Sequence, residues 1–371
     1  MSPARPRSFL VAGLLAGLAA ERLALPADLP GSLIRGLELF RAGQRTRAEP
    51  LLREGLRDVP DHVEALLALA RIHLGWDEYE GALAPAERAA RLAPESCESQ
   101  LILAQARGLK AREISRVRAM FMVGDIRSGF ERAVALDPRH VEARLSLMEF
   151  YLQAPKIAGG DLKKARAEAE AVVALDPLAG LPALSRVAAA EGRPDEALAA
   201  LDRLARLDRG AARLGRASLY AGDLGTRDRA VAELVAVADE DPRDAVDLTA
   251  AGILLGRLER PAEALTLFEQ ARRADPAYLP AAYQLGRALL LARGDLARAE
   301  GAFREYLAGE PPPGAPRPAA AHWRLGQVHE AQGRPAQARR EYEEALRLDP
   351  DQAEARRALS GLGRPAARAP G

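Results

Sequence analysis

Apolar and small residues recur along this 371-residue chain at helical spacing, in short runs that mostly close on a proline. Near the C-terminal end, Leu325 and His329 lie one turn apart, and Ala338 and Tyr342 share one face of a second run. Gly333, between the two runs, favours a turn. The pattern predicts two amphipathic helices that pack against each other through their apolar faces.

The prolines that close these runs recur with a period. Pro60 and Pro94 are 34 residues apart, as are Pro242 and Pro276. The closing prolines are Pro60, Pro94, Pro138, Pro177, Pro242, Pro276, Pro311 and Pro350. The longest interval divides at Asp208-Arg209, where Arg209 stands in place of a proline. A period of about 34 residues is typical of arrays of helix-turn-helix units, so we expect an all-α solenoid of about nine units.

The expected array spans residues 31–350, with units that end near residues 60, 94, 138, 177, 209, 242, 276, 311 and 350. We expect a capping helix at 351–360 and a disordered tail at 361–371. The fifth and sixth units have the weakest pattern. The sixth can also be aligned on Leu214-Gly215.

The last unit has the most complete motif, and it resembles the tetratricopeptide repeat. The residues that carry the resemblance are Leu325, Gly326, His329, Ala338, Tyr342, Ala345 and Pro350. The resemblance implies a right-handed superhelical solenoid. It also implies that the first helix of each unit lines a concave groove, which binds a peptide or a helix of a partner protein.

The groove positions of that family can be transferred to this sequence. They include Leu37, Phe40, Arg71, Gln105, Tyr283, Arg287, Trp323 and Gln327. Tyr, Arg and Trp dominate interface energies, so we hypothesise that Tyr283, Arg287 and Trp323 form a hot spot. The alternative is that Trp323 packs between adjacent repeats. The sequence has no Asn, which argues against the family's Lys and Asn clamp for a terminal carboxylate.

Two units are longer than the period. The third inserts residues 108–124, and between Arg107 and Arg118 five basic residues accompany one acidic residue. This insertion either lengthens a hairpin that buries its own apolar face, or forms a basic amphipathic helix, at 107–122, that contacts a partner helix or a membrane surface. The fourth unit inserts residues 153–161, which lack the spacing of a phosphate-binding loop and predict a structural loop. Both insertions resemble those of a group of bacterial tetratricopeptide proteins, a resemblance that implies no function.

The N-terminal segment has the pattern of an export signal. Arg5 and Arg7 precede an apolar run from Phe9 to Ala20 with small residues suited to cleavage. We expect residues 1–20 to be a signal peptide and the protein to be periplasmic or secreted. The alternatives are an uncleaved inner-membrane anchor and a cytoplasmic capping helix.

The composition and the motifs of the chain argue against nucleic-acid binding and against catalysis. Lys and Arg (53) nearly balance Asp and Glu (52), so no net field attracts nucleic acid. Cys97 is the only cysteine, and no metal-binding or nucleophile motif is present. We therefore expect no enzyme, cofactor or metal, and a scaffold that binds a protein partner. The alternatives are a membrane-anchored envelope assembly factor and, less favoured, an enzyme or small-ligand binder.

Overall fold

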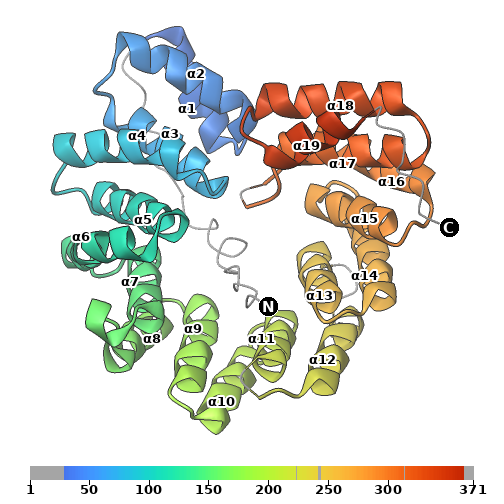
Figure 1. Ribbon diagram of the computed structural model, residues 1–371. Coiled ribbons are helices and arrows are strands. Elements are labelled where there is room, and N and C mark those ends of the chain that lie inside the picture. Colours follow the sequence, from blue (N-terminus) through green and yellow to red (C-terminus); the bar gives the residue numbers. More distant parts are fainter. Residues whose placement is uncertain (1–28, 223, 241–243, 313, 363–371) are drawn as a thin grey trace. The chain divides into compact units, whose positions relative to one another are not determined.

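The computed structural model describes residues 29–222, 224–240, 244–312 and 314–362 (Figure 1). The predicted signal segment 1–20 and residues 363–371 of the predicted tail lie outside these ranges. Within the described ranges every regular element is a helix. None of these helices is both long and apolar enough to cross a membrane.

The chain divides into two compact parts, Met1–Gly215 and Arg216–Gly371, which we call the N-terminal part and the C-terminal part. The helices of the N-terminal part are α1 (Gly31–Arg41), α2 (Arg45–Asp58), α3 (Val63–Gly75), α4 (Tyr79–Leu92), α5 (Cys97–Glu113), α6 (Arg116–Leu136), α7 (Val141–Gln153), α8 (Leu162–Leu175), α9 (Pro177–Ala190) and α10 (Pro194–Leu204). The boundary falls within α11 (Arg209–Ala221). The remaining helices are α12 (Arg227–Glu240), α13 (Ala245–Arg257), α14 (Pro261–Ala274), α15 (Leu279–Leu291), α16 (Leu296–Ala308), α17 (Pro318–Ala331), α18 (Pro335–Leu348) and α19 (Ala353–Gly361).

Across the described ranges, α1/α2 through α17/α18 follow one another as nine helix pairs, which we number as repeats 1 to 9. The all-α repeat fold predicted from the proline period is therefore confirmed. The sixth pair, α11/α12, begins at Arg209, so this repeat starts where the missing proline was inferred. Helix α19 follows the last pair.

Each part is built from two layers of helices. In the N-terminal part the first helices of successive pairs contact one another, α1 with α3, α3 with α5, α5 with α7 and α7 with α9. In the C-terminal part α13 contacts α15, and α15 contacts α17. The first helices thus form one continuous layer within each part. All eight residues predicted to line the groove lie on these first helices.

Glycines at the crossing points let the two helices of a repeat pack closely. A Cβ atom added to Gly326 on α17 would lie 2.4 Å from the ring of Tyr342 on α18, and one added to Gly252 would lie 2.5 Å from Phe268. Both rings are buried, and burying such a side chain contributes about 2–3 kcal/mol. The Leu-Gly motif therefore provides the space that an aromatic ring of the second helix fills.

The recurrent Leu-Asp-Pro motif forms the corner between repeats. At these corners a carboxylate oxygen accepts a hydrogen bond of 2.8 to 3.1 Å from the backbone N–H two residues later. The acceptors are Asp137, Asp176, Asp275 and Asp349. The proline between donor and acceptor fixes φ and has no N–H to leave unpaired. The motif thus ends one repeat and starts the next.

The third repeat is a lengthened hairpin, since α5 has 17 residues and α6 has 21. Its apolar residues are buried only near the neighbouring repeats: Leu109 and Ile126 are in the core, whereas Val117 and Phe121 are exposed. The insertion in the fourth repeat contains a short 3-10 helix, η1 (Lys156–Ala158). A Cβ atom on Gly160 would lie 1.7 Å from a backbone oxygen, so backbone packing requires this glycine. That supports the structural interpretation of this loop.

Candidate peptide-binding surface

The apolar end of the predicted groove belongs to the core. Leu37 on α1 is 0% exposed and lies in a cluster with Leu33 and Leu52. Phe40, also on α1, is half-buried and packs against the same cluster. The Leu37 side chain is therefore inaccessible to a ligand, and Phe40 is only partly accessible. The sequence placed both residues on the right helix, but it could not show how deeply neighbouring repeats cover them.

Arg71 on α3 and Gln105 on α5 are brought together by a shared carboxylate. A terminal nitrogen of Arg71 lies 3.3 Å from Glu142 Oε2, and Gln105 Nε2 donates to Glu142 Oε1 over 2.9 Å. Arg71 Nε also donates to Glu98 Oε1 over 2.5 Å. Gln105 Nε2 is 3.3 Å from Ser146 Oγ. These contacts join the first helices of repeats 2, 3 and 4.

Glu98 is the best-stabilised carboxylate of this cluster. Burial by itself would raise the pKa of Glu98, but hydrogen bonds from His140 and Arg71 and the charge of Arg71 lower it to about 2. Glu98 in turn raises the pKa of His140. The Nδ1 atom of His140 accepts a hydrogen bond from the N–H of Ala143 at the start of α7, which requires an unprotonated Nδ1. Each of these side chains already has a partner within the cluster, so it suits a link between repeats better than a ligand site.

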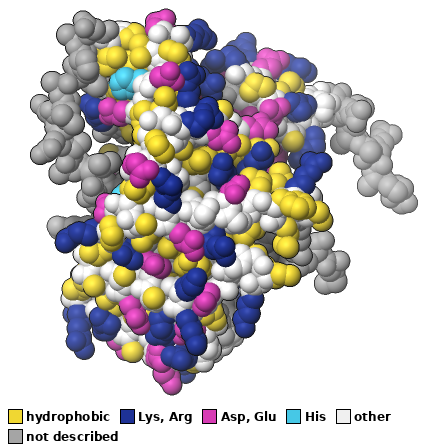
Figure 2. All heavy atoms as spheres, turned by 90° about the vertical axis from the view of Figure 1, so that its left-hand side faces the viewer, with side chains coloured by type: hydrophobic (Ala, Val, Ile, Leu, Met, Phe, Trp, Pro, Cys, Tyr) yellow, Lys and Arg dark blue, Asp and Glu magenta, His cyan; other side chains and the backbone are white. Residues whose placement is uncertain are grey.

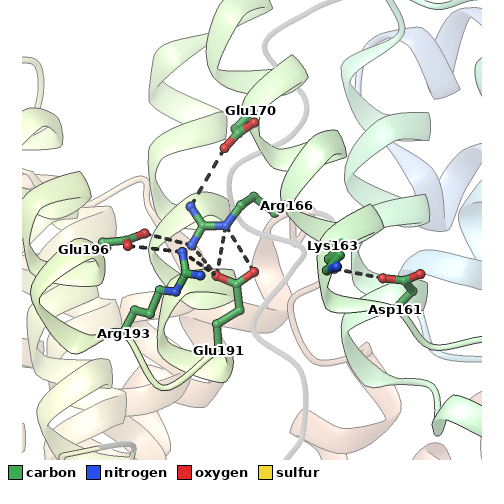
Figure 3. A network of polar contacts seen from close by, with 7 residues as sticks. All are labelled: Asp161, Lys163, Arg166, Glu170, Glu191, Arg193 and Glu196. Atoms are coloured by element: carbon green, nitrogen blue, oxygen red, sulfur yellow. Dashed lines mark hydrogen bonds and ion pairs between the residues drawn. The ribbon is translucent and has the colours of Figure 1, made fainter.

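A second cluster of this kind ties repeat 4 to repeat 5, as Figure 3 shows. Arg166 Nε on α8 donates to both carboxylate oxygens of Glu191, over 3.1 and 2.9 Å, and a terminal nitrogen of Arg166 reaches Glu196 over 2.9 Å. The hydrogen bond from Arg166 is the main reason that the pKa of Glu191 is lowered. Arg193 lies beside both glutamates. Here too the charges pair internally and leave no open site.

In the C-terminal part, Tyr283 of the predicted hot spot is a core residue. It is 6% exposed, and its ring centroid lies 5.6 Å from that of Phe303 and 5.1 Å from that of Tyr306. Burial raises the pKa of Tyr283, and the neighbouring guanidinium groups of Arg324 and Arg287 oppose that rise. Tyr283 therefore packs in the core of the C-terminal part, and its ring is not available to contact a ligand.

The accessible residues of the predicted hot spot lie on neighbouring helices, α15 and α17. Arg287 on α15 is exposed and donates to Gln284 Oε1 over 3.3 Å. Trp323 and Gln327, on α17, are half-buried. Helices α15 and α17 pack against each other, so these side chains belong to one surface of the C-terminal part. We call Arg287, Trp323, Arg324 and Gln327 the α15–α17 surface.

Arg324 belongs to this surface, although the sequence did not indicate it. Its Cζ atom lies 4.0 Å from the ring centroid of Trp323, close enough for a cation–π contact. One terminal nitrogen donates to Gln327 Oε1 over 3.0 Å, while the buried Nε has no hydrogen-bond partner. The only sequence signal was its position next to Trp323. The orientation of the Arg324 guanidinium, over the Trp323 ring and towards Gln327, could be learned only from the structure.

The described residues offer no other obvious chemical site. Among them no group of three or more His, Cys, Asp or Glu side chains is placed to hold a metal ion. Cys97 is half-buried, and burial followed by the charge of Asp137 raises its pKa to about 11. Such a thiol is protonated at neutral pH and is a poor nucleophile. On the face drawn in Figure 2, basic and acidic side chains are interspersed.

Comparison with known proteins gives a family assignment. Models of the family described as "Tetratricopeptide repeat" match residues 35–96 and 249–316, and a second such model matches residues 319–352. These segments cover repeats 1, 2, 7, 8 and 9, including the whole α15–α17 surface. No curated protein matches the chain.

Several solved structures are similar to the chain. A thermophilic tetratricopeptide-repeat protein from Thermus thermophilus is 24% identical, with a TM-score of 0.42, over 55% of this chain and 97% of that one. A tetratricopeptide repeat protein from Parabacteroides merdae is 15% identical, with a TM-score of 0.46, over 70% and 97%. Yeast Tom70 is 14% identical, with a TM-score of 0.42, over 89% and 80%. The family matches identify tetratricopeptide repeats in residues 35–96, 249–316 and 319–352 of this chain, and the nine consecutive helix pairs continue the same helix-pair architecture through the described residues between them.

Proposed function

We propose that the protein is a non-catalytic scaffold whose α15–α17 surface binds an acidic peptide segment of a partner protein. Tetratricopeptide repeats are protein-interaction modules, and the fold supports that general role. The more specific proposal depends on one observation. The guanidinium of Arg324 lies against the indole ring of Trp323 on α17, and Arg287 is exposed on the neighbouring first helix α15; both guanidinium groups are close enough to Tyr283 to oppose the rise of its pKa.

The chemistry of this surface suits a carboxylate next to an apolar side chain. A guanidinium pairs with a carboxylate through two parallel hydrogen bonds, and the geometry favours it over a neutral amide. Trp323 adds a flat apolar area of the kind that dominates interface energies. By contrast, Arg71 of the N-terminal part is already held by Glu98 and Glu142, which makes it a weaker candidate.

The test is peptide display against the full chain, with random peptides that carry either a fixed Glu or a fixed Gln. We expect the Glu set to be enriched, and we expect Arg287→Ala to abolish that enrichment because the substitution removes a guanidinium that pairs with the peptide carboxylate. Arg287 is exposed on α15. Trp323→Ala should lower affinity by about 2 kcal/mol, or thirtyfold. Arg304→Ala on α16, whose side chain is 61% exposed, is the matched control. The proposal is refuted if the Glu and Gln peptide sets are enriched equally, or if the Arg287→Ala variant selects the same peptides as the parent protein.

We also propose that the protein is exported and loses residues 1–20. The support is the pattern of basic residues, apolar run and small residues in the sequence. N-terminal sequencing of the protein from its native host tests the cleavage. Fractionation tests the alternative, since an anchored envelope factor sediments with membranes and a cleaved protein does not.

A further inference from the structure

The two insertions that break the repeat period lie against each other in the N-terminal part. Helix α6 of repeat 3 contacts η1 of repeat 4. Between them lies an open hollow of about 330 Å³, which is lined by Met120, Val123, Arg127, Lys156 and Ile157. We call residues 114–124 together with residues 153–160 the insertion tip. Although they come from different repeats, the two segments form one surface.

The insertion tip exposes large apolar side chains. Phe121 is 84% exposed, Ile157 is 86%, Val117 is 71% and Met120 is 52%. The other large apolar side chains that are exposed in the described ranges come one each from separate elements: Leu92, Leu178, Leu207, Val235, Val246 and Leu291. Grouped exposed apolar side chains mark interaction surfaces, whereas single ones need no explanation.

Basic side chains flank this apolar group. Arg118 and Lys156 are exposed, and neither has an ion-pair partner among the described residues. Arg127 lines the hollow and, among the described residues, forms a long ion pair of 3.8 Å to Glu131. Lys110 is on α5, close in sequence to the tip. The sequence between Arg107 and Arg118 carries five basic residues and one acidic residue, in a protein whose formal net charge is +1. The local surplus of positive charge therefore favours an anionic occupant.

The shape of the tip distinguishes between occupants. A peptide-binding site receives a partner's apolar side chains in a pocket, whereas here the protein's own apolar side chains protrude almost fully into solvent. Protruding aromatic and aliphatic side chains with basic neighbours are the arrangement by which a protein inserts into the interface of an anionic bilayer. We propose that the insertion tip binds the surface of an anionic phospholipid bilayer. Phe121, Val117 and Ile157 enter the headgroup region, and Arg118 and Lys156 contact phosphates.

A local probe tests the insertion directly. Phe121→Trp in the full chain is mixed with vesicles of phosphatidylcholine and phosphatidylglycerol that carry brominated acyl chains, which quench nearby indoles. The signal of Trp76 and Trp323 is measured with the unsubstituted protein and subtracted. Leu291→Trp, at a side chain that is 63% exposed on α15, is the matched control. We expect quenching at position 121 and none at position 291.

This readout also separates the tip from the N-terminal apolar run, which can hold the chain on vesicles by itself. If the chain binds vesicles while position 121 stays unquenched, the proposal is overturned. Quenching that is equal on pure phosphatidylcholine vesicles, or unaffected by salt, overturns the role of the basic residues. If the fluorescence of Trp at position 121 changes when a host protein fraction is added without lipid, the insertion tip binds a protein partner and the bilayer proposal is overturned.

Charge variants give the size of the effect. Arg118→Gln and Lys156→Gln should each weaken binding to phosphatidylglycerol vesicles, as followed by quenching at position 121, by about fivefold. Arg304→Gln, on the other part of the chain, should leave it unchanged. Both tip residues are exposed, so the variants keep the fold. Unchanged quenching curves for the two tip variants would contradict the proposal, and the peptide-display result would stand regardless.

Discussion

Replacing Glu98 by Gln should loosen repeats 2 to 4 in a pH-dependent way. The substitution keeps the size of the side chain but removes the charge that Arg71 and His140 stabilise. Arg71, whose side chain is only 19% exposed, then retains Glu142 at 3.3 Å as its remaining carboxylate partner in the cluster. A partly buried guanidinium that loses its nearer partner is destabilising.

The magnitude follows from the pKa of Glu98. A fall from the ordinary value of 4.5 to about 2 corresponds to roughly 3.4 kcal/mol, at about 1.36 kcal/mol for each pKa unit. Because 34% of the Glu98 side chain is exposed, solvent screening reduces this substantially, and we expect about 1.5 kcal/mol. That corresponds to amide exchange about tenfold faster.

The assay is hydrogen exchange of the amides in α3, α5 and α7, since stability in a repeat protein is local. The matched control is Glu95→Gln, because Glu95 also pairs with an arginine, Arg132, but its side chain is 75% exposed. We expect the control to change stability by about 0.5 kcal/mol or less.

The pH dependence has a definite sign. Because folding lowers the pKa of Glu98, its contribution is complete above the unfolded value of 4.5 and is lost as the pH falls towards 2. The difference between the parent protein and Glu98→Gln should therefore shrink as the pH is lowered from about 5. If Glu98→Gln exchanges no faster than Glu95→Gln, or if the difference is the same at low pH, the Arg71–Glu98 interaction does not have the strength we assign to it.

Two further predictions concern backbone and packing. Gly326→Ala should destabilise repeat 9 by about 1–3 kcal/mol, because the added Cβ would press on the ring of Tyr342. Gly301→Ala has open space around the added Cβ and should stabilise α16 by up to about 1 kcal/mol. Thermal unfolding followed by helical circular dichroism compares the two variants, and equal effects would contradict the packing argument. At the left-handed turn positions, Glu259→Gly (φ of 59°) should stabilise repeat 7 by about 0.5–1 kcal/mol, and Gly333→Ala (φ of 72°) should destabilise repeat 9 by a similar amount. Both changes are measured as shifts in the urea midpoint of unfolding. If Glu259→Gly is destabilising instead, the contacts of the Glu259 side chain contribute more to stability than the strain of its backbone costs.

The fold could be predicted from the sequence because each repeat carries its own local signals. The Leu-Asp-Pro corners use contacts within three residues, and the small residue that faces an aromatic ring lies about sixteen positions before it, as Gly326 and Tyr342 do. Even the repeat without its proline begins at Arg209, since Asp208 accepts a hydrogen bond from the N–H of Ala211. Where structure is set locally, the pattern in the sequence is sufficient.

The candidate sites were less predictable because they depend on contacts between repeats. Arg71 and Gln105 were placed on the correct helices, but Glu142 is 71 residues beyond Arg71, and no local pattern indicates that they meet. Tyr283 was expected on the surface, yet Phe303 and Tyr306 of α16 cover it. The exposure of Phe121 and Ile157 depends on how far the two insertions extend beyond the neighbouring repeats.

The contact between Arg71 and Glu142 has a consequence for how this protein unfolds. A linear repeat protein is well described by the stability of each repeat plus a coupling between immediate neighbours, so unfolding fronts can stop at any interface. Arg71 belongs to repeat 2 and Glu142 to repeat 4, so their ion pair adds a coupling between second neighbours. An unfolding front that enters repeat 3 must therefore break contacts of three repeats together. In statistical terms, this ion pair adds a second-neighbour term that favours unfolding of repeats 2 to 4 together over unfolding that stops at the interfaces between them.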